Sequence, residues 1–86
     1  MSRSHAIEDD ELDTDKVAGL VAYNIRRLRR KSGWSVEECC DESGIAVPVW
    51  YRIESADLQR GNFQSIDLAA DLFGVHVTEM FRRPRK

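Results

Sequence analysis

Long apolar runs are missing from this sequence of 86 residues. A helix that crosses a membrane needs about 20 consecutive apolar residues, and no segment approaches that length. The first ten residues, MSRSHAIEDD, also lack the apolar core of a signal peptide. We therefore expect a cytoplasmic protein without a membrane partner. A chain of this size has room for one domain and for no separate small-molecule ligand domain.

Cysteine and histidine are scarce. The two cysteines, Cys39 and Cys40, are adjacent, so they cannot form an ordinary disulfide without strain, and a reducing compartment suits them. We interpret both as small residues that pack between helices. His5 and His76 have no partners at catalytic or metal-ligand spacing. The sequence therefore predicts no enzyme activity, no cofactor and no metal site.

The formal net charge of -2 divides unevenly along the chain. Residues 1–15 hold six acids and one base, whereas residues 16–86 hold twelve bases and nine acids. The sequence predicts that residues 1–14 form a disordered acidic leader, because they are poor in apolar residues and have no periodicity. This leader is either a solubilising tail or an arm that folds back on a basic surface and competes with phosphate. Residues 82–86, RRPRK, are expected to form a short, flexible basic tail.

The stretch VEECCDESGIAVPVWYRIES combines small and bulky residues at informative positions. Cys40 is its fifth residue and Gly44 its ninth, whereas Trp50 and Ile53 are its fifteenth and eighteenth. A small fifth residue lets a second helix pack closely over the first, and the glycine can take the positive φ of a tight turn. Trp50 and Ile53 lie one turn apart on a single helix face. This spacing is typical of a helix-turn-helix, whose second helix usually enters the major groove of DNA.

The flanking segments carry a wider resemblance. The stretches NIRRLRRKSGWSVEECCDESGI and FQSIDLAADLFGVHVTEMF resemble the lambda-repressor-like (Xre-type) DNA-binding domain. The resemblance covers roughly Val17 to Phe81, with about one extra residue in the loop before Phe63. It implies a compact, all-α, five-helix domain over residues 15–81. It also implies a sequence-specific transcription regulator that binds double-stranded DNA, with a homodimer on an inverted repeat as the expected assembly.

The first helix is expected to begin near residues 15–16 and to end near residue 31. Its apolar residues recur at spacings of three and four: Val17, Leu20, Val21, Ile25 and Leu28. We expect Arg26 and Arg30 opposite this buried face and Arg27 beside it, as a cationic surface that is either solvated or in contact with DNA. Arg29 matches the family arginine that pairs with a glutamate near the end of the recognition helix, here Glu54. The resemblance thus implies a structural ion pair between them.

Glycines and caps predict the remaining helix ends. Ser35 and Glu38 form a capping-box pattern for a second helix over residues 36–43. Val36 stands where the family commonly has a glutamine that contacts a phosphate. A fourth helix is expected to follow Asn62 as its cap and to end at Gly74. Its predicted core face is Phe63, Ile66, Ala70 and Phe73, and a last turn through residues 78–81 closes the core.

The recognition helix is expected to span about Ala46 to Ser55. With Trp50 and Ile53 buried, helical geometry places Pro48, Tyr51, Arg52 and Ser55 outward and Val47 and Val49 on the flanks. The resemblance implies base reading from the positions of Val47, Pro48 and Arg52, two of which are apolar here. It also implies backbone contacts from Arg60 and Asn62 in the following loop. The predicted DNA-binding residues are Val47, Pro48, Tyr51, Arg52, Ser55, Arg60 and Asn62.

The apolar recognition edge leaves a second interpretation open. Arg52 can take guanine through a bidentate pair, and apolar side chains can touch thymine methyl groups, so DNA reading with modest specificity is one outcome. Alternatively, Val47, Pro48, Val49 and Tyr51 form a surface that binds a protein partner, because exposed apolar patches mark interaction sites and a fold does not determine function.

Overall fold

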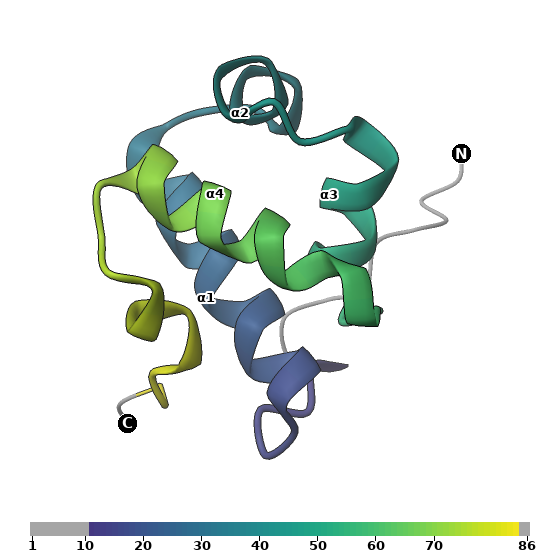
Figure 1. Ribbon diagram of the computed structural model, residues 1–86. Helices are drawn as coiled ribbons and strands as arrows, with labels where there is room; N and C mark the ends of the chain where they lie inside the picture. The colour runs from purple at the N-terminus through teal and green to yellow at the C-terminus, as the bar shows by residue number, and fades with distance from the viewer. Residues whose placement is uncertain (1–10, 85–86) are drawn as a thin grey trace.

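The computed structural model describes residues 11–84, except for the side chain of Arg60. Within that part the chain is all helical and has no strand (Figure 1). The elements are α1 (Val17–Ser32), α2 (Val36–Ser43), α3 (Val47–Glu54), η2 (Arg60–Asn62), α4 (Phe63–Phe73) and η3 (Val77–Phe81). No helix among the described residues is long and apolar enough to cross a membrane.

The fifth predicted helix is a 3-10 segment rather than an α-helix. The structure therefore has four α-helices among its described residues. The Nδ1 atom of His76 accepts a hydrogen bond from the backbone N–H of Thr78 at 3.2 Å and caps the segment. Arg82 has already returned to extended backbone (φ -79°, ψ 134°), and Pro84 disfavours helical backbone at the residue before it. Only a single short turn fits between these two limits.

The turn between α2 and α3 forms as the sequence predicts. Ser35 and Glu38 make a reciprocal capping box, in which the Glu38 N–H donates to Ser35 Oγ at 3.1 Å and the Ser35 N–H donates to Glu38 Oε1 at 2.8 Å. Gly44 ends α2 with φ 83°, a conformation that L side chains rarely adopt. Its N–H donates to the Cys40 carbonyl at 2.9 Å. The capping box thus fixes the start of α2, and Gly44 ends that helix before the turn into α3.

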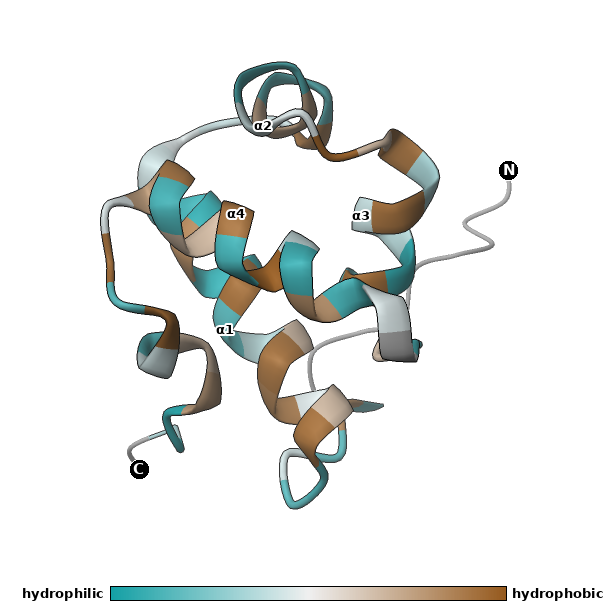
Figure 2. Cartoon of the chain, viewed as in Figure 1, coloured by the Kyte–Doolittle hydropathy of each residue, from teal (hydrophilic) through white to brown (hydrophobic). Residues whose placement is uncertain are grey.

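Trp50 lies at the centre of the core and is 0% exposed. Its ring packs edge to face against Phe73, with the ring centroids 6.1 Å apart. Figure 2 shows apolar residues alternating with polar ones along α1 and α4, as expected for helices that bury one face. The prediction for Phe63 was wrong, because this side chain is 55% exposed in the first turn of α4. The buried residues of α4 are Ile66, Ala69 and Ala70.

The segment before α1 packs onto that helix. Leu12, which we assigned to the leader, is buried. The backbone of Asp13 passes so close to Gly19 that a Cβ atom on Gly19 would collide with the Asp13 carbonyl. The packed part of the chain thus includes Leu12. Residues 1–10 of the predicted leader and residues 85–86 of the predicted tail lie outside the described residues.

Asn24 holds the end of η3 against α1. Its side chain is 1% exposed. The Nδ2 group lies within hydrogen-bonding distance of three backbone carbonyls, those of Leu20 (3.1 Å), Met80 (3.0 Å) and Arg82 (2.8 Å). A buried amide is costly unless it is hydrogen-bonded, so this arrangement specifies where the chain after η3 must lie.

Candidate nucleic-acid interface

Helix α3 is held by its inner face. It packs against α1 and α2, and Trp50 and Ile53 point into the core with 0% and 1% exposure. Ala46 precedes the helix and offers no side-chain cap, and Pro48 occupies the first turn, where its missing N–H leaves no intrahelical bond unmade. The position of α3 therefore depends on packing and on contacts at its C-terminal end.

Glu54 makes those contacts. Arg29 approaches its carboxylate with two donors, Nε to Oε2 at 2.6 Å and Nη2 to Oε1 at 3.0 Å. The Trp50 indole Nε1 donates to the same Oε2 atom at 2.7 Å. The side chains of Arg29 and Glu54 are 19% and 9% exposed. This bidentate pair joins α1 to α3, and the buried indole N–H is satisfied within it.

Arg26 makes a second hydrogen-bonded contact between α1 and α3. Its Nε donates to the backbone carbonyl of Glu54 at 2.9 Å. The residue is 5% exposed, so the expectation that it lies on an open cationic surface was wrong. The physical reason is that the end of α3 covers this part of α1. Arg26 thus satisfies a carbonyl at the C-terminal end of α3, where a cation is favoured.

The electrostatics of this network favour one charge state. The hydrogen bond to Glu54 raises the pKa of Arg29, with burial acting in the opposite direction. Burial raises the pKa of the Cys39 thiol to about 11, so the thiol is neutral at physiological pH. Neutral Cys39 places no second negative charge beside the Arg29–Glu54 pair. The Arg29–Glu54 ion pair therefore holds the inner face of α3 in addition to the packing of its apolar side chains.

The outer edge of α3 has a different composition. Pro48 and Arg52 are exposed, and the flanking residues Val47, Val49, Tyr51 and Ser55 are half-buried. Tyr51 and Ser55 already have interactions within the chain. Of the predicted DNA-binding residues on this helix, Arg52 alone combines exposure with a charge. The edge therefore offers one strong donor beside a mainly apolar surface.

The loop after α3 places two further predicted residues. Asn62 is buried, and its Oδ1 accepts from the Gln59 N–H at 3.0 Å. Its side chain caps the short η2 segment and makes no cap bond to α4, so the prediction that it caps α4 was wrong. The reason is that η2 leads directly into α4. Asn62 thus supports the loop from within, and the side chain of Arg60 lies outside what the structure describes.

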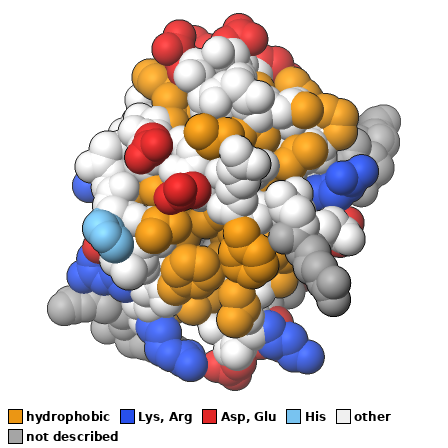
Figure 3. Space-filling model, viewed as in Figure 1, with side chains coloured by type: hydrophobic (Ala, Val, Ile, Leu, Met, Phe, Trp, Pro, Cys, Tyr) orange, Lys and Arg blue, Asp and Glu red, His pale blue; other side chains and the backbone are white. Residues whose placement is uncertain are grey.

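Helix α2 carries an acidic surface. Glu37, Asp41 and Glu42 are exposed on α2. Figure 3 shows acidic side chains gathered at the top of the view, over α2. Phosphate would be repelled there, so this surface is unsuited to nucleic acid.

Comparisons with known proteins give one informative likeness. No family model matches the chain, and no curated protein sequence matches it. Among solved structures, the fold is similar to the crystal structure of the hypothetical transcription factor NHTF from Neisseria. The TM-score is 0.75 at 25% sequence identity, and the match covers 84% of this chain and 82% of that chain. The chain thus has an all-α fold like that of a protein described as a transcription factor.

Proposed function

We propose that this protein is a DNA-binding transcription regulator of the Xre type that places α3 in the major groove. The observation that carries the proposal is the way in which α3 is held against the rest of the domain. Glu54, Arg29 and Trp50 hold its inner face, while Pro48 and Arg52 remain exposed on its outer edge. A rigidly held helix with an exposed edge is the arrangement that major-groove reading requires. The likeness to NHTF supports the same reading.

In this proposal Arg52 supplies the main base contact. A guanidinium can donate two hydrogen bonds to guanine in the major groove, whereas Val47 and Pro48 can touch thymine methyl groups. One strong donor gives modest specificity. We therefore propose a homodimer on an inverted repeat, in which each copy contributes one Arg52.

Selection from random-sequence duplexes tests the proposal. We expect an enriched palindrome for the native protein. On that site, Arg52→Ala should weaken binding by about 1–3 kcal/mol and relax preference at one base-pair position in each half-site. Lys31→Ala, an exposed change near the end of α1, is the matched control for loss of one positive charge. The absence of binding to any duplex at about 50 mM salt, where phosphate contacts are strong, would refute the proposal.

A protein-binding role is the alternative. Val47, Pro48, Val49 and Tyr51 form an apolar surface that is exposed or half-buried. Under this alternative Val47→Asp abolishes capture of the partner, while Arg52→Ala leaves any residual DNA binding weak and independent of sequence. Under either function we propose a cytoplasmic protein that carries out no catalytic step and uses no cofactor.

A further inference from the structure

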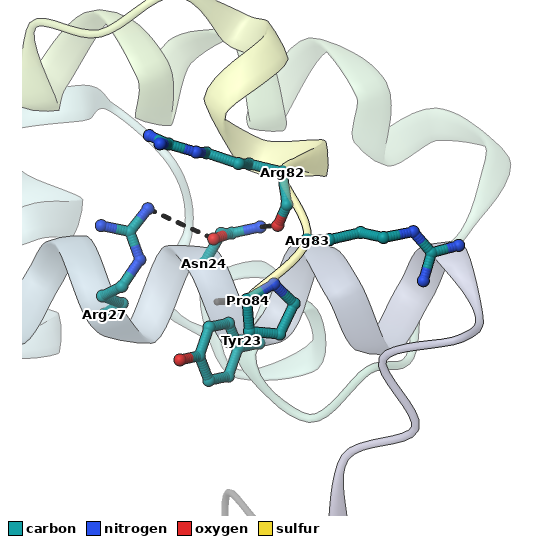
Figure 4. Close-up of a pocket in the computed structure, with 6 residues that line it drawn as sticks. All are labelled: Tyr23, Asn24, Arg27, Arg82, Arg83 and Pro84. Atoms are coloured by element: carbon teal, nitrogen blue, oxygen red, sulfur yellow. Dashed lines mark hydrogen bonds between the residues drawn. The ribbon is translucent and has the colours of Figure 1, made fainter. Parts of the chain in front are cut away.

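A cavity lies between α1 and the chain that follows η3. Its volume is about 300 Å³, and it is lined by Tyr23, Asn24, Arg27, Arg82, Arg83 and Pro84 (Figure 4). This volume is at the lower limit of small-molecule sites, about 300 Å³, so the cavity has room only for a small ligand. Three of its six lining residues are arginines.

Buried contacts set the geometry of the cavity. Asn24 forms part of its wall and fixes the backbone of Arg82, whose carbonyl lies 2.8 Å from Asn24 Nδ2. The opposite end of the same amide, Oδ1, accepts from Arg27 Nη2 at 3.2 Å. One buried amide therefore contacts both the guanidinium of Arg27 and the backbone of Arg82.

The arginines are arranged unequally around the cavity. In Figure 4 the side chains of Arg27 and Arg82 extend toward the same end, whereas Arg83 extends the opposite way. Arg82 Nη1 lies 3.2 Å from Glu79 Oε1, and Arg83 Nη1 lies 3.6 Å from Asp15 Oδ1. Both pairs are exposed, and such pairs are weak. Arg27 and Arg82 thus retain guanidinium donors for an anion at their shared end.

We propose that this cavity binds the phosphate group of a small molecule, between the guanidiniums of Arg27 and Arg82. The planar fork of a guanidinium matches two oxygens of one phosphate, which favours this anion over chloride. The Tyr23 ring lies beside Pro84 and forms an apolar wall for an attached organic group (Figure 4).

This site is separate from the edge of α3. The preceding η3 packs against α1 and α4. In Figure 1 the C-terminal segment lies to the left of α1 and α3 lies to the right. A ligand that bridges Arg27 and Arg82 joins α1 to the C-terminal segment. It therefore stabilises the folded protein by mass action, whether or not the protein binds DNA.

Thermal unfolding of the full chain provides the test. Inorganic phosphate and phenyl phosphate are each added at increasing concentration, and chloride is lowered in step so that the ionic strength stays constant. We expect a saturable rise in Tm, with phenyl phosphate acting at the lower concentration because its ring reaches Tyr23. Arg27→Gln and Arg82→Gln should each raise the half-saturating concentration about tenfold or more, since a charge-assisted hydrogen bond is lost. Lys31→Gln, also on α1, should respond as the native protein does.

Two results would overturn the proposal. A rise in Tm that never saturates and is equal in all variants is the general stabilisation that excluded salts produce. The second result concerns DNA. Phenyl phosphate should shift the NMR signals of Tyr23. If a short DNA duplex reverses that shift, the cavity is a contact for backbone phosphate and not a small-molecule site. Because the titration itself contains no DNA, its outcome does not depend on the function proposed for α3.

Discussion

The two faces of α3 differ in how much water reaches their side chains. On the inner face, the Trp50 indole and the Glu54 carboxylate bond to each other, and Arg29 completes the cluster. On the outer edge, Pro48 and Arg52 are exposed to water. The inner face therefore serves the fold, and the outer edge is open to change without loss of the fold. Stability and the proposed recognition are thus assigned to opposite faces of one helix of eight residues.

The largest expected effect comes from the inner face. Trp50→Ala should lower the free energy of unfolding by about 3–5 kcal/mol, because it leaves a cavity in the core and removes a donor from Glu54. Pro48→Ala, two residues away on the exposed edge, should change stability by less than about 0.5 kcal/mol. Urea denaturation measures both. Equal losses for the two variants would contradict the division between the faces.

The Arg29–Glu54 pair should give the next largest effect. We expect Glu54→Ala to cost about 2–3 kcal/mol, since charge-assisted hydrogen bonds are lost while Arg29 keeps some contact with water. In a double-mutant cycle with Arg29→Ala, the combined loss should be smaller than the sum of the single losses by about 1–3 kcal/mol. Strictly additive losses would show that the pair does not act as a unit.

Alkaline pH should weaken the inner face to a smaller extent. Burial raises the pKa of Cys39 from an ordinary value of 9.0 to about 11 in the folded protein. Above pH 9 the thiol ionises in the unfolded chain first, so stability is intact below pH 9 and falls as the pH rises toward 11. The loss at pH 10 should be about 1 kcal/mol. Denaturation curves at pH 8 and pH 10 give the loss of unfolding free energy between these two pH values. This loss should be smaller in the Cys39→Ala variant than in the native protein by about 1 kcal/mol. An equal loss in both proteins would exclude Cys39 as the cause.

The smallest effect is expected where α3 ends. Ala56 has φ 63°, the left-handed region that a side chain disfavours. Ala56→Gly should relieve this strain, and the gain should be about 0.5 kcal/mol after the larger entropy of glycine in the unfolded chain is subtracted. A thermal scan of this variant should show a slightly higher Tm. A lower Tm would mean that the methyl group of Ala56 contributes more through packing than the strain costs.

Sequence patterns predicted the inner face better than the rest of the molecule. Trp50 and Ile53 were recognisable because burial in a helix follows its period. Arg29 and Glu54 were paired through the family resemblance, and the structure brings them together. Arg26 was misplaced because helical periodicity describes one helix and not the neighbour that covers it. Phe63 was wrongly predicted to be buried, because it lies on the apolar side of α4 but no described element covers the first turn of that helix.

The helical periodicity of the sequence did not predict two features of the candidate sites. Asn24 occupies a position three after Val21 and four before Leu28, which is a core position, and a polar residue there was the available signal for a buried hydrogen-bonded group. The cavity beside it joins α1 to a segment more than 50 residues later, a distance over which periodicity carries no information. The loop before α4 has no strong periodicity either, and the inward position of Asn62 could not be read from it.

The crossing of the N-terminal segment over Gly19 has a topological consequence. Because Gly19 has no side chain, the backbone near Asp13 lies directly on α1, and Asp15 comes within 3.6 Å of Arg83. The two ends of the packed domain therefore emerge at the same pole. Domains of this kind tolerate circular permutation. A short glycine-serine connector between the segments around residues 12 and 84 should preserve the helix packing, with new ends opened in the loop between α3 and α4.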